Sequence, residues 1–171
     1  MIPLTVAANG TLTWSKLSCK PNYELRLNNQ AIGTLKRQSI WSSSYYAETP
    51  DGNWTFRRSG FWGTGSEIVD SGSGQTIATY KAAWGGKGTL TFADGQTFFV
   101  HCKGLFHPVW SILGEGDQPV LQLRVREKRV ELASGVVLTP DRLSLLTMFT
   151  LYCVQRAEED AAAVAVAAAA S

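Results

Sequence analysis

The chain is poor in the side chains that most catalytic and metal sites use. Its 171 residues include two histidines and three cysteines, and no two cysteines have the Cys-x-x-Cys spacing of redox or zinc sites. An odd number of cysteines argues against a disulfide framework and favours a reducing compartment, so we expect a cytoplasmic protein. The cysteines are Cys19, Cys102 and Cys153, and the last lies in an apolar run where we expect a buried free thiol.

Long hydrophobic segments are also lacking. The first ten residues have neither a basic start nor a long apolar stretch, so we expect no secretory signal. The main apolar run, residues 143–154, is twelve residues long, whereas a helix that spans a bilayer needs ~20. We therefore expect a protein that is not transmembrane.

The excess of charge of one sign is small. Sixteen basic residues face 14 acidic ones, and a formal charge of +2 does not indicate nucleic acid as a partner. The balance is uneven, because Glu158, Glu159 and Asp160 stand together near the C-terminus. The rest of the chain is therefore mildly basic. A hydrophobic content of 44% argues against intrinsic disorder.

Motifs of known chemistry are missing as well. Residues 85–89 read Gly-Gly-Lys-Gly-Thr, but Lys81 stands where a Walker A loop needs its first glycine and Gly88 where it needs serine or threonine. No Gly-x-Ser-x-Gly elbow of a serine hydrolase occurs. His101 and Cys102 are neighbours in a predicted strand and so point to opposite faces. We expect no catalytic residue, no metal site and no cofactor. The alternative is an enzyme with a dispersed site near His101 and His107.

What the sequence does contain is a regular series of short β segments from Leu12 to about Leu132. Tyr23, Leu25 and Leu27 alternate with polar residues, as in a half-buried strand, and Asn28-Asn29 then predicts a hairpin turn. Pro50-Asp51-Gly52 predicts another turn, with proline presetting one φ and glycine tolerating a positive one.

Two similar strand–turn–strand units follow, at residues 68–79 and 90–100. Asp70 and Asp94 stand at their turns, where an aspartate accepts hydrogen bonds from the backbone that follows it. We therefore expect structural roles for both carboxylates. Together with the segments near residues 109–113 and 121–132, the series amounts to about a dozen strands, the pattern of a barrel or sandwich.

The pattern changes at Thr139, which predicts an N-cap, with Pro140 at the first helical position and Asp141 in the first turn. In a helix from about 140 to 157, the apolar side chains of residues 143–154 cover nearly the whole circumference, so the helix must be buried on all sides. We expect a mainly β fold, a closed antiparallel barrel around a central hydrophobic C-terminal helix. Residues 1–160 form one domain in this interpretation, and the alanine-rich tail, 161–171, extends the helix or frays.

This arrangement resembles the Tubby-like C-terminal fold, and within it the LURP-one-related family. The residues that carry the resemblance are the two strand–turn–strand units, 68–79 and 90–100, and the closing apolar helix. The resemblance implies a barrel of about twelve strands threaded by the C-terminal helix. Tubby domains bind phosphoinositides through basic residues, but no such set aligns residue by residue with this chain.

Arg124, Arg126, Lys128 and Arg129 gather on one predicted hairpin with its turn at Glu127-Lys128. A two-residue loop would set Arg126 opposite Arg129, and Glu131 could pair with Arg124 across the hairpin. One interpretation is a binding site for an anionic lipid or phosphate. The alternative is a charged edge that prevents strand-to-strand aggregation.

The loop residues Phe61 and Trp62 either insert into a membrane or partner or plug one end of the barrel. We expect a non-enzymatic binding or scaffold domain that contacts anionic phospholipid or a protein partner. A self-associating protein-interaction domain is the third hypothesis, beside the enzyme.

Overall fold

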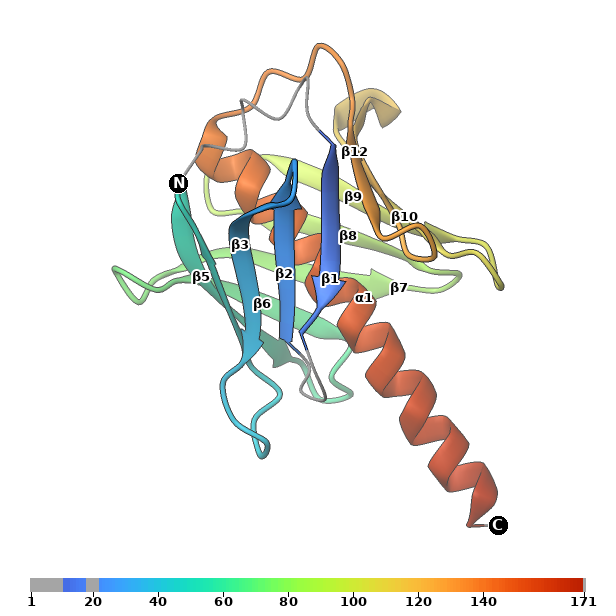
Figure 1. Ribbon diagram of the computed structural model, residues 1–171. Helices are drawn as coiled ribbons and strands as arrows, with labels where there is room; N and C mark the ends of the chain where they lie inside the picture. Colours follow the sequence, from blue (N-terminus) through green and yellow to red (C-terminus); the bar gives the residue numbers. More distant parts are fainter. Residues whose placement is uncertain (1–10, 18–21, 171) are drawn as a thin grey trace.

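The computed structural model describes residues 11–17 and 22–170 (Figure 1). Within these residues the chain forms twelve strands, a short 3-10 helix η2 (Glu115–Asp117) and one long helix, α1 (Pro140–Ala169). The strands are β1 (Leu12–Lys16), β2 (Asn22–Leu27), β3 (Gln30–Arg37), β4 (Tyr45–Thr49), β5 (Gly52–Ser59), β6 (Gly65–Asp70), β7 (Thr76–Ala83), β8 (Lys87–Phe92), β9 (Thr97–Lys103), β10 (Val109–Leu113), β11 (Pro119–Arg124) and β12 (Arg129–Leu132).

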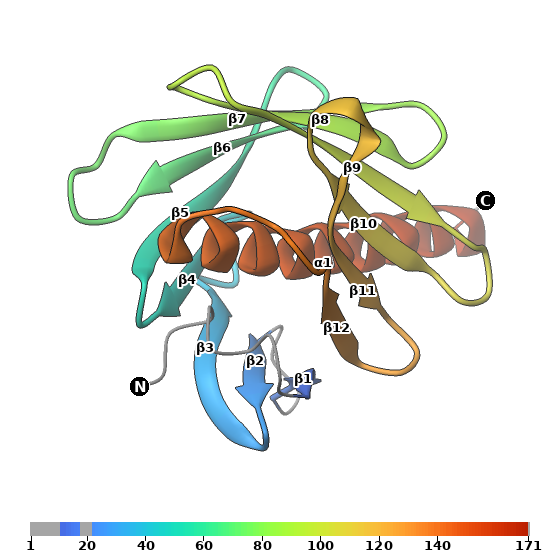
Figure 2. The same cartoon turned by 90° about the horizontal axis from the view of Figure 1, so that it is seen from above.

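The strands close into an up-and-down barrel. Each strand pairs antiparallel with the next along the chain, and β12 returns to pair with β1 through Leu12 opposite Val130 and Thr13 opposite Arg129. In the view from above, α1 runs between strands β1 to β3 on one side and strands β6 to β8 on the other (Figure 2). The predicted fold class, a closed antiparallel barrel of about twelve strands around the C-terminal helix, is confirmed.

The predicted alternation of apolar and polar side chains places one face of each strand inside. In β2, Tyr23, Leu25 and Leu27 are buried while their neighbours are partly exposed. The turn to β3 is the predicted one, and both of its residues, Asn28 and Asn29, have positive φ, which asparagine tolerates better than most residues. The inward side chains of the barrel form one continuous core with the helix.

The helix fills the barrel as its sequence predicts. Residues 143–156 are buried without a break, and the ring of Phe149 packs against the rings of Phe56, Tyr80 and Tyr152 at centroid distances of 5.2–5.8 Å. The Thr147 and Thr150 hydroxyls donate to helix carbonyls four residues earlier, which satisfies both polar groups in the core. Thr139 occupies the N-cap position, although its side chain makes no capping hydrogen bond.

The antiparallel order gives the barrel two distinct ends. The loops that follow the odd-numbered strands lie at one end, which we call the exit end. The loops that follow the even-numbered strands lie at the opposite end, which we call the start end. Helix α1 begins at the start end, where Ser144 donates to Asp51 of the β4–β5 turn at 2.5 Å. It leaves through the exit end, where Arg156 donates to Ser66 of β6 at 2.6 Å. Beyond that point the helix continues outside the barrel (Figure 1).

Two details differ from expectation. The β11–β12 turn spans four residues, Val125 to Lys128, so Arg124 and not Arg126 lies opposite Arg129. The predicted two-residue register is therefore wrong. In addition, α1 extends past residue 157 to Ala169, so the alanine-rich tail continues the helix and does not fray.

Candidate functional site

Exposed apolar side chains gather at the exit end of the barrel. Seven large ones lie on four of its loops, with exposed fractions from 78% at Ile40 to 97% at Trp84. They are Ile40 and Trp41 between β3 and β4, Phe61 and Trp62 between β5 and β6, Trp84 between β7 and β8, and Leu105 and Phe106 between β9 and β10. A large apolar patch on one end of a protein is characteristic of an interaction surface.

The loop of Phe61 and Trp62 projects away from the barrel. The two side chains are 93% and 83% exposed, and their rings contact each other edge to face at 5.1 Å. Gly60 and Gly63 flank them with positive φ, a backbone conformation that a side chain would disfavour. Of the two interpretations of this loop, the plug of the barrel end is therefore wrong.

Charge is divided between the two ends. Among the described residues, the start end holds seven acidic side chains and two basic ones, Arg26 and Arg142. The acidic ones are Glu48, Asp51, Asp70, Asp94, Glu115, Asp117 and Asp141. The other thirteen described basic residues lie toward the exit end, together with the other seven acidic ones, which leaves this end with an excess of six positive charges. The exit end is thus positive in net charge and also carries the apolar patch.

The predicted basic hairpin belongs to this exit end. Arg124 and Arg129 share the carboxylate of Glu131, at 3.2 and 3.9 Å, so the predicted pair between Arg124 and Glu131 is present. Arg126 lies in the turn, with Nη1 3.0 Å from both ring nitrogens of His107. Lys128 is exposed in the same turn. The four predicted residues therefore lie together. Arg124 and Arg129 pair with the same carboxylate, and Arg126 and Lys128 lie in the turn of the hairpin.

Closure of the barrel bears on the alternative interpretation of this hairpin, a charged edge that prevents aggregation. Strand β11 pairs with β10 and β12, whereas β12 pairs with β1 through two positions, Val130 with Leu12 and Arg129 with Thr13. The hairpin is therefore held between neighbouring strands and is less open to pairing with another chain than a free edge strand. The binding interpretation and the protective one both stay predictions.

Three carboxylates surround the point where the helix leaves the barrel. Glu158 lies 3.2 Å from Lys16, and Asp160 lies 2.8 Å from Arg58. Glu159 pairs with Arg37 and Arg58 and accepts a hydrogen bond from Tyr45 at 2.6 Å. Burial, helped by this hydrogen bond, raises the pKa of the Tyr45 hydroxyl above its usual range. We call these carboxylates and their partners the exit collar.

Other basic side chains of the exit end are not engaged in this way. Within residues 11–17 and 22–170, the structure shows no ion pair for Lys81, Lys87, Lys103 or Lys128. All four side chains belong to exposed residues. They are available to an anion that approaches from outside.

Among the described residues, the two histidines have different surroundings and neither of the two cysteines has a lowered pKa. His101 lies within β9, opposite Ser111 and Lys87, whereas His107 contacts Arg126 of the hairpin. Burial raises the pKa of the Cys102 thiol, and raises that of Cys153 to about 12, so neither is an activated nucleophile. Cys19 lies outside the described residues.

The described part of the chain contains no group of three or more His, Cys, Asp or Glu residues that could hold a metal ion. It also contains no helix with the length and apolar character needed to cross a membrane.

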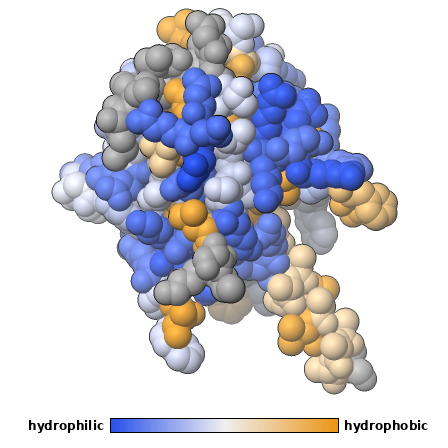
Figure 3. Space-filling model, viewed as in Figure 1, coloured by the Kyte–Doolittle hydropathy of each residue, from blue (hydrophilic) through white to orange (hydrophobic). Residues whose placement is uncertain are grey.

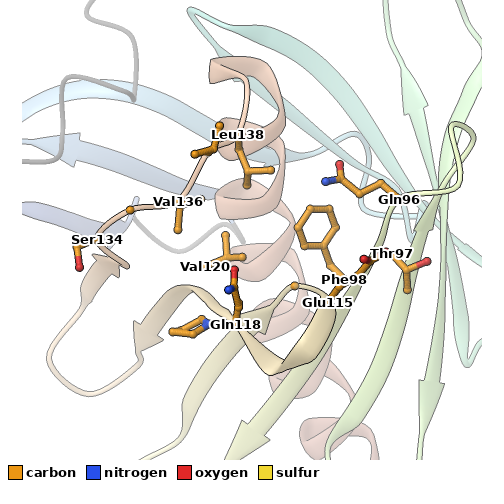
Figure 4. Close-up of a pocket in the computed structure, with 13 residues that line it drawn as sticks. Gln96, Thr97, Phe98, Glu115, Gln118, Val120, Ser134, Val136 and Leu138 are labelled. Carbon is orange, nitrogen blue, oxygen red and sulfur yellow. The ribbon is translucent and has the colours of Figure 1, made fainter.

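A pocket of about 590 Å³ lies at the start end (Figure 4). The β8–β9 turn, η2 and the linker before α1 form its walls. Phe98, Gln118 and Val120 are among the side chains that line it (Figure 4). Among the described residues that line it, Glu115 alone is ionisable. The described lining therefore does not bring together several charged groups, as a catalytic site would.

A second pocket of about 460 Å³ at the same end has an acidic lining, but three of its four carboxylates, those of Asp51, Asp70 and Asp94, are engaged in local structure. Asp70 accepts from the Ser73 backbone N–H and hydroxyl at 2.7 Å, and these bonds, the hydroxyl first, lower its pKa. Asp94 accepts from the Gln96 N–H at 2.9 Å and from Arg142 at 2.8 Å. The predicted turn-stabilising roles of both aspartates are confirmed.

Comparison of the chain with protein-family models, with curated proteins and with solved structures found no match. The resemblance to the LURP-one-related family therefore stays a prediction.

Sequence reasoning found the basic hairpin and one aromatic loop, but missed Trp41, Trp84 and Phe106 as members of the same surface. The available signal was a large apolar residue in a loop, a few residues after a lysine or arginine at or near the end of the preceding strand. Residues 36–41, 81–84 and 103–106 have this form. Only the order of strands shows that these turns share one end.

Proposed function

We propose that this protein is a non-enzymatic binding domain whose exit end docks on a membrane surface rich in anionic phospholipid. The observation that carries the proposal is the coincidence of exposed aromatic side chains and unpaired lysines at one end of a closed barrel. The same end includes the hairpin of Arg124, Arg126, Lys128 and Arg129 as part of the anion-binding surface.

Aromatic and basic side chains suit the two parts of a membrane surface that a docking protein meets, the interfacial layer and the anionic headgroups. Tryptophan is enriched at the membrane–water interface, where its ring sits at the level of the headgroups. Lysine and arginine near an anionic surface contribute about 1 kcal/mol each. Trp84 and Lys87 lie in and beside one turn, and Phe106 follows Lys103 by three residues, so each loop offers both contacts. The acidic start end would face away from such a surface.

Enzymatic activity has less support. His101 and His107 share no described pocket with a carboxylate, and both cysteines of the described chain have raised pKa values. We therefore propose binding and not catalysis as the function of this fold, and cytoplasmic membrane faces, which are anionic, as the surface.

Co-flotation with liposomes tests this proposal. The wild-type protein should float with phosphatidylserine-containing vesicles and not with neutral ones, and added salt should weaken binding. Changing Lys81, Lys87, Lys103 and Lys128 to Ala should weaken binding by about a thousandfold, at about 1 kcal/mol for each lysine. The hairpin variant Arg124→Ala, Arg126→Ala, Arg129→Ala measures the contribution of β11 and β12.

Matched controls lie at the start end. Arg26→Ala removes a basic side chain there, and Val137→Ser removes an apolar side chain that is 96% exposed. Both variants should float like the wild type. Absence of flotation with every vesicle and at every salt concentration would contradict the proposal and direct the search to a protein partner for the same surface.

A further inference from the structure

The last turns of α1 form an apolar rod outside the barrel. After the charged residues 158–160, the helix continues through Ala161–Ala169 with alanine at every position except Val164 and Val166. These two valines are 70% and 69% exposed. The space-filling view shows the rod in apolar colours, projecting away from the barrel (Figure 3). We call residues 161–170 the tail.

The tail has a composition that water does not favour. It has no charged side chain and no polar face, so it differs from an amphipathic helix that lies flat in an interface. Alanine is the strongest helix former, and the buried part of α1 supplies the helical nucleus that a short isolated segment lacks. The tail is therefore a preformed helix that is apolar on every side.

We propose that the tail enters the acyl layer of the membrane when the exit end docks. This inference rests on the proposed function, because the tail projects from the same end as the exposed tryptophans and lysines. Ten helical residues rise about 15 Å, roughly half of a hydrocarbon core of about 30 Å. A helical segment of this length therefore reaches through about one leaflet.

The exit collar sets the depth of penetration. Glu158, Glu159 and Asp160 lie at the base of the tail and cannot follow it into hydrocarbon. Lys16, Arg37 and Arg58 partly neutralise these carboxylates, which reduces their repulsion by an anionic surface. The collar thus stays at the level of the headgroups, and the axis of the barrel stands upright on the membrane.

A second copy of the chain is a weaker candidate for the occupant of this surface. A stable protein interface buries about 1,200–2,000 Å² in total. Two ten-residue helices with small side chains offer much less, so the tail alone does not hold a dimer together. The lipid interpretation also uses the aromatic and basic loops around the tail, which a tail-to-tail contact leaves unexplained.

A nitroxide spin label on the tail tests the inference. The variant Val166→Cys is made with Cys19→Ser and Cys102→Ser, and Cys153 is left in place because it is buried. Glu115→Cys in the same background provides a matched label at the start end, where the side chain is exposed. Collision of each label with oxygen, which concentrates in hydrocarbon, and with a water-soluble nickel complex is measured with and without phosphatidylserine vesicles.

The expected result is a loss of nickel collisions and a gain of oxygen collisions at position 166, with no change at position 115. If vesicles bind but the label at 166 stays accessible to nickel, the tail inference is wrong and the proposed function stands. If no vesicle binds in the parallel flotation assay, the proposed function itself fails. Spin–spin broadening between labels at 166 without vesicles would instead show tail-to-tail association and overturn the inference.

Discussion

Gly88 shows how closely single residues are fitted inside this barrel. It lies in β8, and an added Cβ would overlap the ring and hydroxyl of Tyr80, a core residue of the neighbouring strand. We expect Gly88→Ala to destabilise the protein by about 1–3 kcal/mol, because the ring has to move within a packed core. Urea unfolding measures the change. Gly114→Ala is the control, since its Cβ meets no atom closer than 3.8 Å, and an equal loss in both variants would contradict the explanation.

A second residue-scale prediction concerns pH. The hydrogen bond from Arg142, followed by the one from the Gln96 N–H, holds the pKa of Asp94 below its ordinary value. Ionised Asp94 therefore stabilises the fold above about pH 3.9, the unfolded value, and this stabilisation is lost as the pH falls through the lower folded value. Asp94→Asn should be less stable than the wild type in urea at neutral pH and nearly equal to it at about pH 2. A difference that persists unchanged in acid would indicate altered packing.

At the scale of elements, the barrel depends on the helix inside it. Phe149 is fully buried and packs against rings from β5 and β7. Phe149→Ala should cost about 3–5 kcal/mol in unfolding free energy. Phe149→Asp should prevent folding, because it places a charge on the barrel axis. Circular dichroism and gel filtration provide the measurement, with Ala157→Asp, on the exposed part of the same helix, as the control. A soluble, folded Phe149→Asp protein would refute the buried-helix account.

We expect the exposed part of the helix to contribute to membrane binding and not to stability. Because residues 161–170 are exposed, a chain that ends at Asp160 should unfold at nearly the same temperature as the full chain. The same truncation should weaken binding to anionic vesicles. Thermal unfolding and flotation of the two chains separate these effects. A large fall in melting temperature would mean that the tail supports the fold.

At the scale of the whole molecule, alternation of side chains and an all-round apolar helix were enough to predict a closed barrel with a helix inside. Turn geometry was harder to predict. Gly52 was expected to supply a positive φ, but it does not adopt one, and an added Cβ would lie 2.6 Å from the Trp54 ring. The residues between Arg124 and Arg129 fit a two-residue or a four-residue turn, and cross-strand pairing alone decides between them.

The candidate surface was only partly predictable for a related reason. A basic hairpin and an aromatic loop can be recognised in the sequence, but whether they share an end depends on the order of all twelve strands. Trp41 and Trp84 are 43 positions apart and belong to different hairpins. Closure of the barrel places both at the exit end.

The orientation on the membrane is the central claim, and the protein's own tryptophans test it most directly. Of the six tryptophans, Trp41, Trp62 and Trp84 are exposed at the exit end, Trp14 and Trp54 are buried in the core, and Trp110 is partly buried. With phosphatidylserine vesicles that contain brominated lipid, we expect strong quenching of the fluorescence of the wild-type protein. The variant Trp41→Phe, Trp62→Phe, Trp84→Phe should still bind and lose most of that quenching. Vesicle binding without quenching of the wild type, or with equal quenching of the triple variant, would contradict docking through the exit end.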